Sequence, residues 1–97
     1  MDLKKLYDGI INDGVNFTTK QIKEWGYSSR DIKKLIDEEI IRRVKIGHYE
    51  FLDVNKLYIY GKRLLYNDKD MARKCFIRCL EIDPKHGGAT FNLFLRD

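Results

Sequence analysis

Residues 18–52 read TTKQIKEWGYSSRDIKKLIDEEIIRRVKIGHYEFL, and this stretch decides the fold of the first half of the chain. The pairs Thr18-Thr19 and Ser28-Ser29 are residue types that favour the N-terminal cap of a helix. Gly26 lies between the two segments that these pairs open, where it can end the first helix. A short helix, a turn that contains glycine and a second helix form the helix-turn-helix pattern, which the sequence predicts here.

The second helix of this pair has two different sides. Its apolar side carries Ile32, Leu35, Ile36 and Ile40, and its opposite side carries Arg30, Lys33, Lys34 and Asp37. This spacing is typical of a helix that packs on a core through one side and exposes the other. We therefore expect a buried apolar side and an exposed, largely basic side.

A β-hairpin is predicted directly after this helix. Val44 and Ile46 alternate with Arg43 and Lys45, Gly47 supplies a tight turn, and residues 49–52 alternate again. Upstream, apolar residues at helical spacing predict a first helix over residues 3–11 that stops near Gly14, and residues 15–17 are expected to be a connector. Residues 1–53 are thus predicted to form three helices and a two-stranded hairpin, which would be the wing of a winged helix-turn-helix unit.

The second half of the chain, residues 54–97, is predicted to be helical throughout. One helix runs from residue 57 to about residue 67, a second from residue 71 to residue 82, and a third begins near Gly88. Short turns between them predict an antiparallel helix pair followed by the start of another. The expected fold class is therefore mostly α with a small β-hairpin wing.

Residues 57–84 resemble a tetratricopeptide repeat. The residues that carry the resemblance are Leu57, Gly61, Leu64, Ala72, Phe76, Cys79, Leu80 and Pro84. It implies one repeat plus the start of a second in residues 54–97, and an inner face of the first helix that lines a peptide groove. Tyr58, Tyr60 and Tyr66 on that helix are then candidate protein-binding residues, or they pack within the fold. Since one helix pair cannot bury its own apolar face, we expect the first half of the chain or further repeats to cover it.

The first half is similar to the winged helix-turn-helix heads of small bacterial regulators, including the N-terminal domains of abortive-infection antitoxin repressors. The resemblance rests on three segments: Thr19-Lys20-Gln21-Ile22, Gly26-Tyr27-Ser28-Ser29-Arg30, and the apolar and basic pattern from Leu35 to Tyr49. It implies binding to double-stranded DNA, because the second helix of such a motif enters the major groove with its N-terminal residues on base edges.

The candidate DNA-binding residues come from this helix and from the hairpin after it. They are Ser28, Ser29, Arg30, Lys33, Lys34, Arg42, Arg43 and Lys45. The hairpin residues would contact phosphates or the minor groove. A solvated charged helix face and a hairpin that is basic only for solubility are the alternatives for the two elements.

The charge of the chain is distributed unevenly. Its 97 residues carry a net charge of +4, yet residues 1–53 hold ten basic and ten acidic side chains, and residues 54–97 hold nine and five. A neutral first half predicts modest DNA affinity, so that useful binding would need a homodimer or a second DNA-binding head. A locally basic surface built from residues 20–34 and 42–45 would have to supply the attraction.

Several function classes have no support in the sequence. It has no nucleophile with a matching base, no phosphate-binding glycine loop and no histidine and carboxylates at metal-ligand spacing, so we expect no enzyme, cofactor or metal. Cys75 and Cys79 are expected to be buried thiols in a reducing compartment. Without a signal peptide or membrane-spanning run, we expect a cytoplasmic protein that does not bind membranes.

Two functions follow as hypotheses. The first is a DNA-binding transcriptional regulator or adaptor that recruits a protein or peptide through its repeat-like second half. The alternative is a protein-interaction module in which the winged unit is a scaffold that does not bind DNA. The neutral charge of residues 1–53 favours the alternative, and the basic cluster on the predicted helix and hairpin favours the first.

Overall fold

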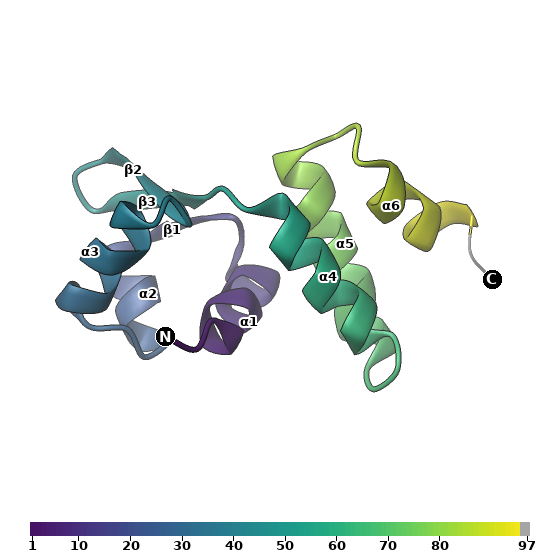
Figure 1. The fold of residues 1–97 in the computed structure, drawn as a ribbon, viewed down its shortest axis with the longest axis horizontal. Helices are drawn as coiled ribbons and strands as arrows, with labels where there is room; N and C mark the ends of the chain where they lie inside the picture. The colour runs from purple at the N-terminus through teal and green to yellow at the C-terminus, as the bar shows by residue number, and fades with distance from the viewer. Residues whose placement is uncertain (96–97) are drawn as a thin grey trace. The chain divides into compact units, whose positions relative to one another are not determined.

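The computed structural model describes residues 1–95, which form a first compact unit, Met1–Asp53, and a second unit that begins at Val54 (Figure 1). The chain is mostly helical and has one small antiparallel sheet, which confirms the coarse fold class predicted from sequence. None of the helices formed by these residues is long and apolar enough to cross a membrane.

The first unit contains three helices and three strands. In chain order these are α1 (Lys4–Asp13), β1 (Asn16–Thr18), α2 (Thr19–Glu24), α3 (Ser29–Asp37), β2 (Ile41–Lys45) and β3 (His48–Phe51). The strands are antiparallel in the order β1-β3-β2. The prediction of a connector over residues 15–17 is therefore wrong, since Phe17 pairs with Tyr49 and Thr18 with His48. The sheet has a third strand beside the predicted hairpin.

Two capping boxes set where α2 and α3 begin. The Thr18 hydroxyl oxygen accepts a hydrogen bond from the Gln21 backbone N–H at 3.2 Å, and the Gln21 side chain accepts one from the Thr18 N–H at 2.9 Å. Ser28 and Asp31 make the same reciprocal pair of bonds at the start of α3, at 3.2 and 2.9 Å. Each box pairs backbone N–H groups that have no partner within the helix, which explains why both helices start at these hydroxyl residues.

The core of the first unit lies between the three helices and one face of the sheet. Its buried side chains are Leu6, Ile10, Ile11, Phe17, Ile22, Tyr27, Ile32, Leu35, Ile40, Ile41, Tyr49 and Phe51. Ile40 is buried as expected, but it is not part of α3, which ends at Asp37. Glu39 lies in the left-handed region with φ 59°, and the Ile40 N–H donates to the Leu35 carbonyl at 3.0 Å. A turn therefore places Ile40 against the core.

Trp25 packs across α1 at a glycine. A Cβ atom added to Gly9 would lie 2.2 Å from the Trp25 ring, so a larger residue would have to displace the ring. The Trp25 indole N–H donates to an Asp13 carboxylate oxygen at 2.7 Å, and its ring centroid lies 5.0 Å from that of Phe17. These contacts fix α1 against the end of α2.

The second unit consists of α4 (Val54–Leu64), α5 (Lys69–Ile82), α6 (Gly87–Thr90) and a π-helical turn, η1 (Phe91–Leu95). Helices α4 and α5 run antiparallel (Figure 1). They approach closely at Gly61, where an added Cβ atom would lie 2.9 Å from Phe76 and 3.0 Å from the Cys75 sulfur. The Cys75 thiol donates to the Leu57 carbonyl at 3.2 Å. Both cysteines are buried thiols, and α4 ends at Leu64, earlier than predicted.

Candidate nucleic-acid interface

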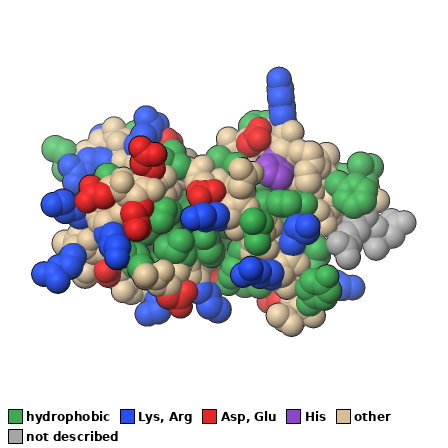
Figure 2. Space-filling view, viewed as in Figure 1, with side chains coloured by type: hydrophobic (Ala, Val, Ile, Leu, Met, Phe, Trp, Pro, Cys, Tyr) green, Lys and Arg blue, Asp and Glu red, His purple; other side chains and the backbone are tan. Residues whose placement is uncertain are grey.

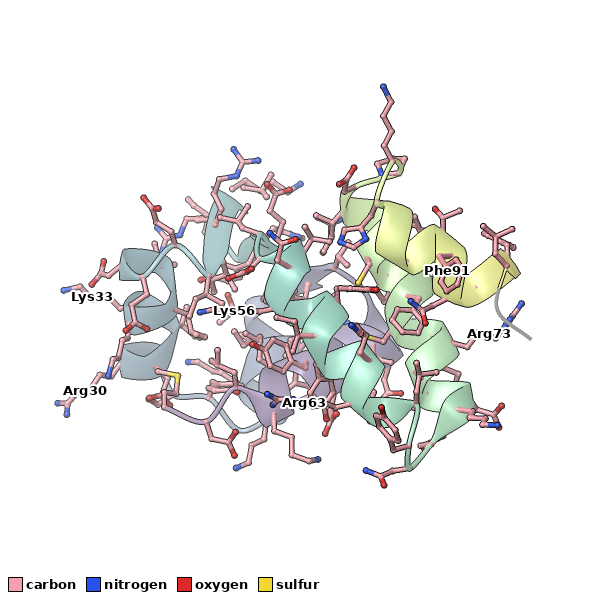
Figure 3. The ribbon with its side chains drawn as sticks, turned by 45° about the vertical axis from the view of Figure 1, so that its right-hand side comes forward. Arg30, Lys33, Lys56, Arg63, Arg73 and Phe91 are labelled. Atoms are coloured by element: carbon pink, nitrogen blue, oxygen red, sulfur yellow. The ribbon has the colours of Figure 1, made fainter. Side chains whose placement is uncertain are left out.

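The first turns of α3 present basic side chains to solvent. Figure 3 shows Arg30 and Lys33 projecting from the same side of α3, away from the rest of the first unit. Both are exposed, as is Lys34 one residue further on. Ile32 and Leu35 hold the opposite side of α3 in the core, with 5% and 0% of their surfaces exposed. The amphipathic pattern of the helix therefore fixes which way these basic residues point.

A groove of about 500 Å³ lies between α3 and the hairpin. Its lining consists of Ser29, Ile32, Lys33, Ile36, Arg43 and Tyr49. Ile32 and Tyr49 are buried, whereas the polar residues Ser29, Lys33 and Arg43 are exposed. The groove thus combines an apolar base with a hydroxyl and two cationic groups from two elements. It brings together three of the predicted site residues, which are ten or more residues apart between helix and hairpin.

Arg42 and Arg43 lie on opposite faces of the sheet. Arg43 pairs with Tyr49, whose side chain lines the groove, and Arg42 pairs with Glu50 on the other face. The Arg42 side-chain Nε donates to Glu50 Oε1 at 2.7 Å, and the two groups form an ion pair. The predicted basic residues therefore do not all converge on one surface, because Arg42 points away and has an acidic partner.

Two acidic residues of the first unit pair with basic side chains away from the groove, and a third, Asp31, caps the start of α3. Asp8 forms an ion pair with Lys4 at 2.8 Å, and Glu50 binds Arg42. Hydrogen bonds from Ser28 hold the pKa of the Asp31 carboxyl below its usual range, so this residue stays charged as part of the helix cap. Within residues 1–95, none of the remaining predicted cations takes part in an ion pair: Arg30, Lys33, Lys34, Arg43 and Lys45. The equal numbers of basic and acidic residues therefore conceal a locally cationic surface.

That surface also has acidic side chains near it. Asp37 ends α3 and the exposed Glu38 and Glu39 follow it. Figure 2 shows blue basic side chains at the outer edge of the first unit with red acidic ones between them. An anionic ligand would be attracted to the first turns of α3 and the hairpin, and repelled from the end of α3.

The hairpin is held in place by α2 as well as by β1. The Thr19 N–H donates to the Gly47 carbonyl at 3.1 Å, and the Thr19 hydroxyl lies 3.5 Å from the Tyr49 hydroxyl. Lys45 pairs with His48 after a β-bulge that follows Arg43. Lys45 borders a second hollow, of about 230 Å³, between the hairpin, β1 and α2. Arg43 and Lys45 therefore flank the hairpin at two different depressions.

Ser28, one of the predicted DNA-binding residues, is the N-cap of α3, the role that its residue type favours. Its hydroxyl oxygen accepts the N–H of Asp31, so one acceptor position of this oxygen is used by the helix cap. Ser29, the first residue of α3, reaches the groove instead. The Ser28-Ser29 pair thus supplies one residue that caps α3 and one that lines the groove.

The three tyrosines chosen as protein-binding residues lie in different environments. The Tyr58 hydroxyl accepts a hydrogen bond from Asn92 at 3.1 Å, and its ring lies 4.7 Å from His86 and 5.7 Å from Phe76 between centroids. Tyr58 is therefore half-buried and has partners within the second unit. Tyr60 is half-buried, whereas Tyr66 is 90% exposed.

Phe91 and Phe94 on η1 are exposed aromatic residues that sequence reasoning did not select, and Figure 3 labels Phe91. In the sequence these two residues belong to an apolar segment at helical spacing, a pattern that buried core residues share, so the spacing does not distinguish exposed from buried positions.

Within the described residues, no three His, Cys, Asp or Glu side chains lie close enough to hold a metal ion. Comparison of the chain with protein-family models, with curated proteins and with solved structures finds no match. The cationic groups on α3 and the hairpin are thus the feature of this surface that bears on function.

Proposed function

We propose that the first unit is a winged helix-turn-helix that binds double-stranded DNA, with α3 in the major groove and the β2–β3 hairpin as its wing. The observation that carries the proposal is the groove in which Ser29 and Lys33 of α3 meet Arg43 of the hairpin. The element order, with two capped helices followed directly by an antiparallel hairpin, supports it. A B-form major groove admits a helix of this kind.

Each cation has a distinct role in this proposal. Arg30 and Lys33 project from the first turns of α3 and contact base edges, where Arg and Lys favour guanine O6 and N7. Lys34 and Arg43 contact phosphates on either side of the helix. Arg42 contributes little, because Glu50 binds it on the far face of the sheet. Asp37, Glu38 and Glu39 weaken binding, so a homodimer that presents two heads supplies the affinity.

A titration of the full chain with a labelled duplex tests the proposal. We expect fluorescence anisotropy to report binding at low salt, and the double variant Arg30→Ala/Lys33→Ala to lose at least tenfold in affinity. Lys69→Ala/Lys74→Ala in α5 is the matched control, since it removes two exposed positive charges from the second unit. Unchanged binding by the double variant, or amide NMR signals of α3 that do not move when duplex is added, would overturn the proposal.

A second candidate function belongs to the second unit. Its exposed aromatic side chains, Tyr66 at 90%, Phe94 at 68% and Phe91 at 52%, favour a protein-binding segment that resembles a tetratricopeptide repeat. In that case the chain is a regulator or adaptor that also holds a protein or peptide. Partners captured by the chain should survive nuclease treatment and be lost with Phe94→Ser but not with Lys69→Ser. Partners that depend on nucleic acid would count against this function.

A further inference from the structure

The tip of the hairpin exposes apolar side chains among basic ones. Ile46 is 92% exposed and Val44 is 54% exposed, and the cationic Lys45 lies between them. In Figure 2, green hydrophobic side chains lie beside blue basic ones at this end of the first unit. Single exposed apolar residues are common on protein surfaces. Here the exposed isoleucine lies next to basic side chains, so a ligand with both an apolar and an anionic part could bind the hairpin tip.

Hydrogen bonds anchor the backbone on the C-terminal side of Ile46. Gly47 adopts φ 76°, in the left-handed region that glycine tolerates, and its carbonyl accepts the Thr19 N–H at 3.1 Å. His48 pairs with Lys45 on one side and with Thr18 on the other, so the strand after the tip is bonded along both edges. The bulge between Arg43 and Lys45 adds local twist to the hairpin. Ile46 therefore lies in a turn whose neighbouring residues are bonded to α2 and to the sheet.

An apolar side chain beside basic residues is the arrangement by which some proteins bind and bend DNA through its minor groove. Such proteins insert an apolar side chain between two base pairs, partly unstack them and bend the duplex, while nearby basic residues contact the phosphates. We propose that Ile46 is a wedge that enters the minor groove beside the site read by α3, with Arg43 and Lys45 on the flanking phosphates. The proposal rests on the DNA-binding function proposed above and adds a bend in the bound DNA to it.

The stacking strength of the base pairs also indicates where in the duplex the wedge enters. Pyrimidine–purine steps such as TA unstack most readily, so they are the favoured insertion points. A duplex with a TA step placed at different distances from the α3 site should therefore bind best at one distance. A position at which the bound duplex bends most then marks where the hairpin tip lies.

The test uses the full chain and a duplex that carries 2-aminopurine at the TA step and a fluorescent dye at each end. Wild-type protein should raise the 2-aminopurine emission and increase energy transfer between the ends. Ile46→Ser should abolish both signals and weaken binding about tenfold, because the buried apolar contact is lost. Ile46→Leu should keep them, and Ile77→Ser is the control, since Ile77 is an isoleucine of α5 that is 44% exposed.

The possible outcomes separate the two proposals. If wild-type protein binds duplex but Ile46→Ser bends and unstacks it equally, the wedge is overturned and the DNA-binding function stands. If wild-type protein binds no duplex, both proposals fall. Binding to vesicles of anionic phospholipid that requires Ile46, with no bend in bound DNA, would likewise overturn the wedge in favour of a membrane contact. Circular dichroism of each variant shows that the fold is retained.

Discussion

Arg42 and Arg43 provide a sharp test of the proposed interface, because these adjacent arginines differ in face and in partner. Both are exposed, but Arg43 lines the groove beside Lys33, whereas Arg42 binds Glu50 on the other side of the sheet. We expect Arg43→Ala to remove one phosphate contact and Arg42→Ala to remove none. The two variants have the same change in composition and net charge, so a difference between them reports position alone.

The size of the difference follows from counterion release. Each phosphate contact on B-form DNA contributes about 0.9 to the slope of log K against log salt concentration. Arg43→Ala should therefore reduce the magnitude of this slope by about 0.9 and weaken binding about eightfold at 100 mM salt. Because the slope changes, the ratio of wild-type to variant affinity should fall about 3.5-fold between 50 and 200 mM salt. Arg42→Ala should leave the slope unchanged.

Fluorescence anisotropy of a labelled duplex, measured at five or more salt concentrations, gives the slopes directly. Thermal unfolding of each variant confirms that equal amounts of folded protein are compared. Equal slopes for the two variants, or a larger reduction for Arg42→Ala, would refute the assignment of Arg43 to the interface. Such a result would mean that charge density alone, and not the groove, attracts the duplex.

Three further predictions concern the framework that positions this surface. Tyr27→Phe should lower the free energy of unfolding by about 1–2 kcal/mol in urea titrations, because the Leu6 N–H donates to the buried Tyr27 hydroxyl at 3.0 Å and would lose its partner. Gly9→Ala should destabilise the chain by about 1–3 kcal/mol, although alanine favours helix, because the added methyl group would displace the Trp25 ring; a gain in melting temperature would contradict this close packing. Asp31 has a lowered pKa from its capping hydrogen bonds, so its contribution to stability is present above about pH 4 and is lost as the pH falls through the lowered pKa. Asp31→Asn should flatten this acid limb of the stability profile, and an unchanged limb would show that the cap does not set it.

Local signals in the sequence were sufficient for the helices of the first unit but not for its sheet. Thr18 and Ser28 mark where their helices begin, because each side chain accepts a hydrogen bond from the backbone N–H three residues further on. Strand β1 has only three residues, too few for an alternating pattern, and it exists because β3 offers it an edge. A pairing between residues thirty or more positions apart cannot be predicted from either segment alone.

The candidate DNA-binding site was predicted as two serines and six basic residues, and only Ser29, Lys33 and Arg43 of these line the same groove. Neighbouring residues of a strand point to opposite faces of the sheet, so Arg42 and Arg43 lie on different faces although both add one positive charge to the segment. The partner of Arg42 lies eight residues away across the hairpin, and the Asn92 partner of Tyr58 lies 34 residues away. Which side chains already have a partner within their own chain depends on such tertiary contacts, and these cannot be predicted from the local sequence.

The placement of Trp25 makes the first unit optically distinguishable from the second. It is the sole tryptophan of the chain, and its indole lies against Gly9 and Phe17 with its N–H bonded to Asp13. Excitation near 295 nm therefore reports loosening of the first unit alone, whereas far-ultraviolet signals sum over every helix. The difference between the two melting curves measures directly whether the halves of the chain unfold as one cooperative body or in succession.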